Sequence, residues 1–132
     1  MEVTISIKEA RMPITVFHVK GSIDSNTNQA LSAQIDAEIE KGTRNVLLDL
    51  TETEYISSAG LRAIHQTHTD LRKFSPKETG TMIMRGVRDG TYKSEHLKIA
   101  TTNANILELF KTSGFDMYIE IFKTVEEAAA AF

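Results

Sequence analysis

The short run "NVLLDL" at residues 45–50 constrains the fold of this chain more than any other segment. Its apolar residues are nearly continuous rather than alternating, which is typical of a strand that is covered on both faces. Strands of that kind occur in parallel sheets with helices packed against them. The run therefore predicts an α/β fold around a buried central strand, whose carboxyl end carries Asp49.

Four further segments predict strands. At residues 3–9, valine and isoleucine alternate with threonine and serine, which is the pattern of a half-buried strand. Residues 14–21 are rich in β-branched and aromatic side chains, and the proline-containing turn before them indicates an antiparallel pair with the first strand. Residues 96–101 and 117–122 predict the last two strands.

Helix signals follow the second strand and each later strand. Polar residues that can cap a helix stand at 24–27, in the serine pair 57–58, and at Asn103 and Thr124, each before a helical pattern. The predicted order is β-β-α-β-α-loop-β-α-β-α. This order indicates one domain over residues 1–132, with a mixed, mostly parallel sheet, an antiparallel N-terminal strand pair and about four packed helices. A long loop or insertion is expected at about residues 75–94, which are rich in glycine and charged residues.

The composition excludes several classes of protein. The chain has 132 residues, of which 41% are hydrophobic, and a net charge of −3, so a general attraction to nucleic acid is not expected. There is no cysteine, which excludes disulfide and thiolate chemistry. No apolar run approaches the roughly 20 residues of a membrane span, and no signal pattern opens the chain. We therefore expect a cytoplasmic protein with a protein partner.

The stretch "YISSAG" at residues 55–60 holds the most informative side chains, Ser57 and Ser58. A serine before a helix is a common N-cap. A nucleophilic serine needs a base and oxyanion donors, but the G-x-S-x-G elbow is absent, and His65 and His68 follow on the same predicted helix. A third alternative is a regulatory phosphate, because the N–H groups of a helix N-terminus tolerate an added anion.

Other enzymatic and metal sites receive little support. The spacing of His65 and His68 could place two ligands on one helix face, but no third ligand is evident, and His68 shares a stripe with apolar residues. A phosphate-accepting receiver built on Asp49 would need an acidic pair after the first strand and a strand-end lysine, and neither is found. We therefore expect no catalytic residue, no metal and no cofactor.

The run "VLLDLTETEYISSAGLRAI" resembles the signature of the STAS domain, specifically that of bacterial anti-sigma factor antagonists. In that signature Asp49 matches the acid at the strand end, Ser58 matches the phosphorylated serine, and Leu61 matches the residue after the glycine. "KGSIDSNT" is similar to the second strand and loop of the family, with Asp24 as its acid. The resemblance extends to the C-terminal helix, strand and helix, and it excludes about residues 75–94.

The resemblance implies a regulatory protein rather than an enzyme. Its unphosphorylated form would bind an anti-sigma factor that is also a serine kinase and thereby release a sigma factor. Phosphorylation of Ser58, favoured over Ser57, would end that binding, and a metal-dependent serine phosphatase would restore it. A STAS scaffold module without a switch, in a stress-signalling assembly, is the alternative function, and a weak homodimer is a further possibility. The residues expected to bind or shape the partner surface are Asp24, Asp49, Thr51, Ser57, Gly60 and Leu61.

Overall fold

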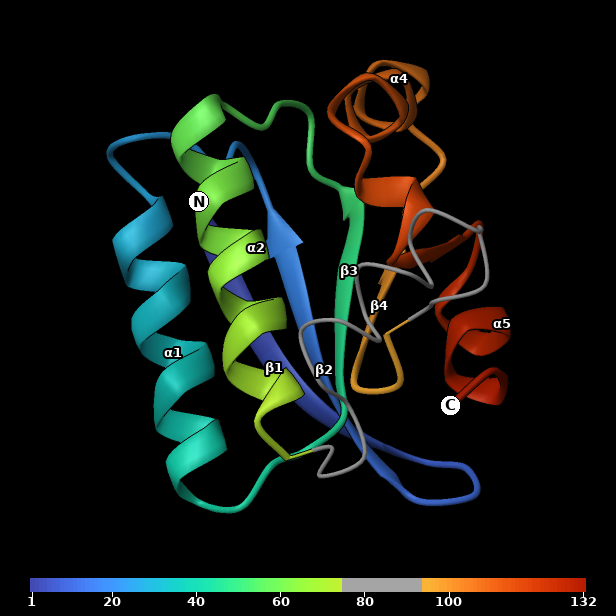
Figure 1. The fold of residues 1–132 in the computed structure, drawn as a ribbon. Coiled ribbons are helices and arrows are strands. Elements are labelled where there is room, and N and C mark those ends of the chain that lie inside the picture. The colour runs from blue at the N-terminus through green and yellow to red at the C-terminus, as the bar shows by residue number, and fades with distance from the viewer. Residues whose placement is uncertain (75–93) are drawn as a thin grey trace.

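The computed structural model describes residues 1–74 and 94–132, and within them five strands form one mixed sheet (Figure 1). The strands lie in the order in which they occur in the sequence, and β1 pairs with β2 antiparallel while all later neighbours are parallel. The strands are β1 (Glu2–Glu9), β2 (Pro13–Lys20), β3 (Val46–Glu52), β4 (Leu97–Ala100) and β5 (Glu120–Phe122). The predicted α/β sheet with its antiparallel N-terminal pair is confirmed.

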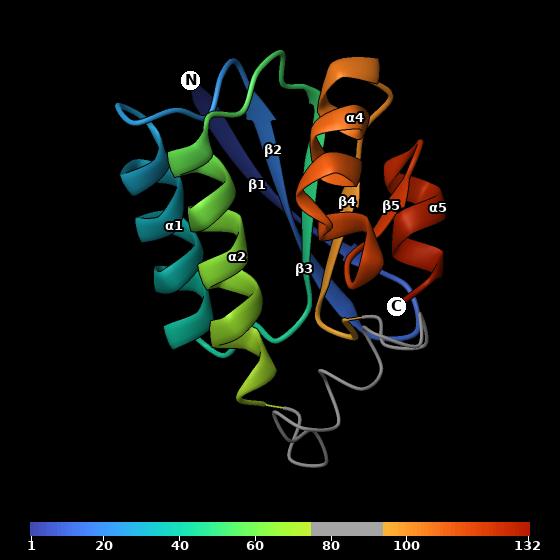
Figure 2. The same ribbon diagram turned by 45° about the horizontal axis from the view of Figure 1, so that its top comes forward.

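Four α-helices within the described residues pack on the two sides of this sheet (Figures 1 and 2). Three share a core cluster on one side, and the last packs against the other side. The three are α1 (Asn28–Glu40), α2 (Ser58–Arg72) and α4 (Ala104–Ser113), and the last is α5 (Val125–Ala130); a short 3-10 turn, η1 (Phe115–Met117), follows α4. Except for Ser94, the predicted long loop at about residues 75–94 lies outside the described residues. No helix of the described part is long and apolar enough to span a membrane.

β3 is buried on both faces, as its continuous apolar run predicts. Leu48 and Leu50 belong to the cluster under α1, α2 and α4, whereas Leu47 belongs to the cluster under α5. All three side chains have no exposed surface. The residues of β3 therefore alternate between the two sides of the sheet, and this alternation decides which way the polar Asp49 points.

Local capping signals set most of the helix starts. The side chains of Ser57, Asn103 and Thr124 each accept a hydrogen bond from a backbone N–H in the first turn of the helix that follows. The N-cap residue of α1 is Thr27, within the predicted residues 24–27, but Thr27 makes no side-chain capping bond. Asp24 instead accepts hydrogen bonds from backbone N–H groups in the turn before α1.

The predicted burial of β1 is wrong in its second half. Its alternating pattern predicts one buried face, but Ile5 is 37% exposed and Ile7 is 58% exposed. Only Val3 of the three alternating apolar residues packs against the core. The physical reason is position: β1 is an edge strand, and Figure 1 shows it running behind α2 and away from α1 towards the β1–β2 hairpin.

Two ionisable residues of the described part, His68 and Lys98, are buried, and His68 lies on α2. His68 is 3% exposed, and burial, with smaller contributions from the positive charges of His65 and Arg72, lowers its pKa to about 4. The imidazole is therefore neutral in the folded protein at pH 7 and tilts against the ring of Tyr118, with ring centroids 5.0 Å apart. The same burial raises the pKa of Tyr118 to about 12, so its hydroxyl stays protonated.

Because His68 stays neutral when folded, the free energy of unfolding is expected to fall by about 2 kcal/mol between pH 7 and pH 5. Below its ordinary pKa of 6.5 the unfolded chain binds a proton at this histidine, whereas the folded chain does so only near pH 4. Urea unfolding at both pH values measures the loss. His68→Leu should remove most of this fall in the free energy of unfolding. His96→Leu, a control directly before β4, should retain the fall. An unchanged pH dependence in His68→Leu would contradict the argument.

Candidate functional site

Two loops meet at the carboxyl edge of the sheet, beside the start of α2 (Figure 2). Ile23, in the loop after β2, forms an isolated parallel bridge with Ile56, in the loop after β3. The N–H of Ile23 donates to the carbonyl oxygen of Tyr55 at 2.9 Å, and the N–H of Ser57 donates to the carbonyl oxygen of Ile23 at 2.9 Å. The first loop thus fixes the backbone of the second directly before α2.

Asp24 stabilises the first of these loops. Its Oδ1 atom accepts hydrogen bonds from the N–H groups of Asn26, at 2.9 Å, and Thr27, at 3.2 Å. The hydroxyl of Thr27 in turn lies 2.9 Å from the carbonyl oxygen of Ser22 and donates to it. Asp24 therefore acts on the site through the loop that carries Ile23.

The two serines of "YISSAG" occupy different positions. Ser57 is the half-buried N-cap of α2, and its Oγ accepts the N–H of Gly60 at 3.1 Å. Ser58 is the first residue of α2 and is exposed. Its hydroxyl forms no hydrogen bond with any residue in the described part of the chain. The cap is thus made by Ser57, and the hydroxyl that a second protein could reach is that of Ser58.

Gly60 permits the close approach of α2 to the first loop. A Cβ atom at this position would lie 2.6 Å from the carbonyl oxygen of Ile23 and 2.9 Å from Cγ2 of Ile56. Real Cβ contacts are essentially never that short, and the nearest atom belongs to backbone that cannot rotate away. The glycine is buried, so its contribution to the site is packing rather than contact with a partner.

A groove with a volume of about 350 Å³ opens beside Ser58, between the start of α2 and α4. Its apolar part comes from both helices and from the loop between β3 and α2. Tyr55, one of the residues that line the groove, is 57% exposed. The lining residues are Glu54, Tyr55, Ile56, Ser58, Leu61, Asn105, Ile106 and Leu109.

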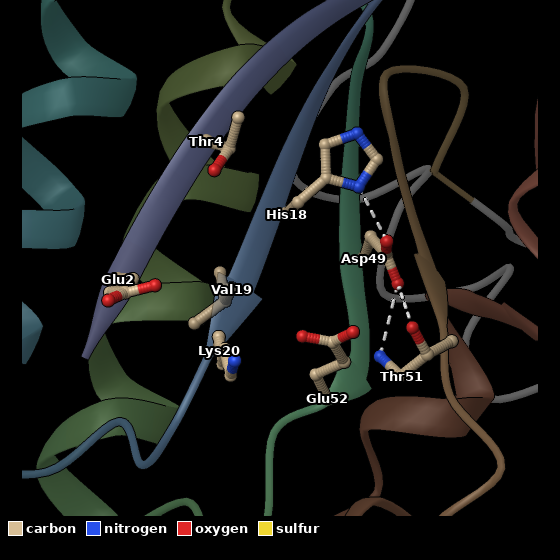
Figure 3. Close-up of a pocket in the computed structure, with 8 residues that line it drawn as sticks. All are labelled: Glu2, Thr4, His18, Val19, Lys20, Asp49, Thr51 and Glu52. Carbon is tan, nitrogen blue, oxygen red and sulfur yellow. Dashed lines mark hydrogen bonds and ion pairs between the residues drawn. The ribbon is translucent and has the colours of Figure 1, made fainter.

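Asp49 and Thr51 lie on the other side of the sheet, in a separate polar cluster (Figure 3). The Oδ2 atom of Asp49 is 2.6 Å from Nδ1 of His18, and Oδ1 accepts the hydroxyl of Thr51 at 2.6 Å and its N–H at 3.1 Å. Burial alone raises the pKa of Asp49, but the hydrogen bonds from Thr51 and His18 outweigh burial and hold the pKa below its ordinary value of 3.8. The carboxylate is therefore ionised and fully engaged at neutral pH.

The structure thus places the candidate site residues predicted from the sequence in two separate groups. Five of them lie together at the carboxyl edge around the start of α2: Asp24, Ser57, Ser58, Gly60 and Leu61. Asp49 and Thr51 face the side of α5, where they line two hollows that do not include Ser58. Their role in partner binding stays a prediction.

Sequence reasoning missed the partner of Asp49. His18 lies directly opposite Asp49 in the parallel pairing of β2 with β3. The signal was present in the sequence, since each of two adjacent buried strands carries an ionisable residue, His18 or Asp49, between apolar neighbours. Elsewhere, Nδ1 of His65 lies 3.0 Å from the hydroxyl of Tyr118. Within the described ranges 1–74 and 94–132, no group of three or more acidic or histidine side chains could hold a metal ion.

Comparisons with known proteins identify the same family that the sequence motif resembles. The family model described as STAS domain matches residues 6–128. The chain is 30% identical over 114 residues to BtrV of Bordetella bronchiseptica, named as a candidate anti-sigma factor antagonist, and the match covers 86% of this chain and 82% of BtrV.

Two solved structures share the fold. An anti-sigma factor antagonist from Mycobacterium paratuberculosis superposes with a TM-score of 0.68 at 18% identity, covering 98% of this chain and 93% of that one. SpoIIAA, a Bacillus cell fate determinant solved in its phosphorylated form, superposes with a TM-score of 0.58 at 13% identity, covering 95% of this chain and 96% of that one. At these identities the two structures support the fold alone.

Proposed function

The chain belongs to the STAS domain family, and we propose that it is an anti-sigma factor antagonist whose binding to an anti-sigma factor serine kinase is switched off by phosphorylation of Ser58. In this proposal the chain is a regulatory binding protein and not an enzyme. Binding of the unphosphorylated form withdraws the kinase from a sigma factor. A metal-dependent serine phosphatase then returns the phosphorylated form to the active state.

The observation that supports the proposal most is that the two serines occupy different positions, one bonded within the domain and one exposed. Ser57 is held as the cap of α2, so its oxygen is already a hydrogen-bond acceptor within the domain. Ser58 is exposed at the first position of the same helix. A kinase that extends over the start of α2 would reach the Ser58 hydroxyl without disturbing the cap. The description of SpoIIAA in a phosphorylated form is consistent with such chemistry in a protein of this fold.

A phosphate on Ser58 would change the surface without unfolding the domain. It adds roughly 1.5 to 2 negative charges at pH 7. The N-terminus of α2 stabilises a negative charge, because its first N–H groups and the helix dipole point towards it. The groove beside Ser58 already contains the acidic side chain of Glu54. A partner seated there would therefore meet new bulk and new charge at once, while the fold remains intact.

The groove between α2 and α4 is the surface that we assign to the partner. Leu61 and Leu109 are half-buried and offer apolar contacts, and Tyr55 offers a large exposed ring with a polar hydroxyl. Aromatic and aliphatic side chains of this kind are common at the centres of protein interfaces. Asp24, Ser57 and Gly60 would support this surface by fixing the loops and the helix start.

Phosphate mapping tests the proposal. The unmodified protein is incubated with its cognate anti-sigma factor kinase and ATP, and the products are analysed by mass spectrometry. One phosphate is expected per chain, retained in Ser57→Ala and lost in Ser58→Ala. A phosphate on Ser57 instead would move the switch to the capping residue. A stable complex with no phosphate on either serine would favour the scaffold module without a switch.

A further inference from the structure

β1 leaves one edge of the sheet open. It pairs with β2 along its whole length, from Glu2 opposite Lys20 to Glu9 opposite Pro13, without a register shift. It is the first strand in the sheet order, so among the described residues nothing pairs with its outer edge. The strand has eight residues and contains neither proline nor glycine. A long, regular and unprotected edge of this kind is a template for pairing with another strand.

Four of the eight exposed large apolar side chains in the described part of the chain lie on or beside this strand and its hairpin: Met1, Ile5, Ile7 and Met12. Ile7 is the most exposed, at 58%, and Ile5 and Met12 are each 37% exposed. Ile5 and Ile7 lie on the side of the sheet that carries α1, because they alternate in step with Val3, which packs against the core cluster that includes α1. The edge therefore offers apolar side chains as well as unpaired backbone groups to an incoming strand.

The sequence of β1 is complementary to itself when it is reversed. In an antiparallel pair related by a two-fold axis perpendicular to the sheet, opposite residues must lie on the same side of the sheet. An axis through Ile5 places Ile5 opposite Ile5 of a second copy and Val3 opposite Ile7. It also places Thr4 opposite Ser6, and Glu2 opposite Lys8. Each of these cross-strand pairs is favourable, and each except the central one occurs twice in a two-fold dimer.

Neighbouring registers retain apolar pairs but lose the pairing of Glu2 with Lys8. An axis through Ser6 would place Lys8 opposite Thr4 and the charged Glu9 opposite Val3. An axis through Thr4 would place Glu2 opposite Ser6 and leave Lys8 beyond the pairing. Among the described residues, the ion-pair partner of Lys8 is Glu126, at 3.8 Å, whose side chain is 75% exposed. An exposed pair of this kind is weak, so Lys8 is available to a carboxylate of a second copy.

We propose that two copies of this chain associate through antiparallel pairing of their β1 strands about a two-fold axis at Ile5. The pairing joins the two sheets into one continuous sheet. It leaves the start of α2 and the groove beside Ser58 outside the interface, so the dimer does not depend on the kinase or on phosphorylation. Because the contact is one strand wide, it belongs to the small, transient class of interfaces and should form with rising protein concentration.

Disulfide trapping tests the register directly, because the chain contains no cysteine. Residues opposite each other in an antiparallel pair have Cα atoms about 4.5 to 5.5 Å apart, which is within the span of a disulfide. Under a mild thiol oxidant, Ile5→Cys should form a covalent dimer quickly. Ile7→Cys alone should not, whereas a mixture of Ile7→Cys with Val3→Cys should. Leu107→Cys, at a residue of α4 that is 39% exposed, is the control for random collision.

Charge exchange provides the second test. Lys8→Glu places two glutamates opposite each other at both ends of the paired strands, and it should raise the dissociation constant of the dimer about tenfold in sedimentation velocity. Glu2→Lys should do the same, and the double variant should restore the original value. A monomer at all concentrations, or Ile5→Cys that crosslinks no faster than Leu107→Cys, would overturn the proposal.

Discussion

Replacing Gly60 with alanine is expected to lower the free energy of unfolding by about 2 kcal/mol, and replacing it with valine should lower it further. The added Cβ would lie 2.6 Å from the carbonyl oxygen of Ile23, which the N–H of Ser57 already holds in place. To relieve that contact, the start of α2 would have to move away from the loop after β2. Urea unfolding followed by circular dichroism measures the change.

Helix propensity alone predicts the opposite sign for the same substitution. Glycine in a helix is less favourable than alanine by roughly 1 kcal/mol, so a helix start without close neighbours would gain stability from Gly60→Ala. Ala37→Val, at an exposed position of α1, measures the effect of helix propensity without a packing conflict and should change stability by less than about 1 kcal/mol. A Gly60→Ala protein more stable than the parent would show that the contact with Ile23 does not constrain this helix.

The order of strands and helices could be predicted because its signals are local. The apolar run of β3 and the capping residues Ser57, Asn103 and Thr124 each act on neighbouring residues of the chain. The position of Ser58 at the start of α2 followed from the same signals. The groove beside Ser58 did not, because α4 supplies part of it from a segment more than 40 residues away in the sequence.

The two faces of the sheet could be predicted only in part. Alternation indicates that Leu48 and Asp49 face opposite sides, but not which side carries α2. The sequence motif therefore predicts Asp49 and Ser58 on one surface, whereas in the structure Asp49 pairs with His18 on the side of α5. In the same way, the pattern of β1 indicates an apolar face but not whether a helix covers it, so the exposure of Ile7 could not be foreseen.

Ser58→Asp is expected to weaken binding of the cognate anti-sigma factor kinase about 100-fold, equivalent to about 2.7 kcal/mol, whereas Ser58→Ala should change it only a few-fold. The carboxylate adds a negative charge at the exposed start of α2, in a groove that already contains Glu54, and a partner that buries this edge must desolvate both charges. Isothermal titration calorimetry on purified proteins measures the two affinities.

The stability of the same variant separates a switch from a damaged fold. An aspartate in the first turn of α2 interacts favourably with the helix N-terminus, so Ser58→Asp should unfold at the same or a slightly higher urea concentration than the parent. Ala37→Asp adds the same charge at an exposed position in the C-terminal half of α1, and it should bind the kinase normally. Loss of binding in Ser58→Asp alone, with stability retained, would place the effect at the groove beside Ser58. Equal binding by the parent, Ser58→Asp and Ala37→Asp would show that a negative charge at position 58 is not the basis of the switch.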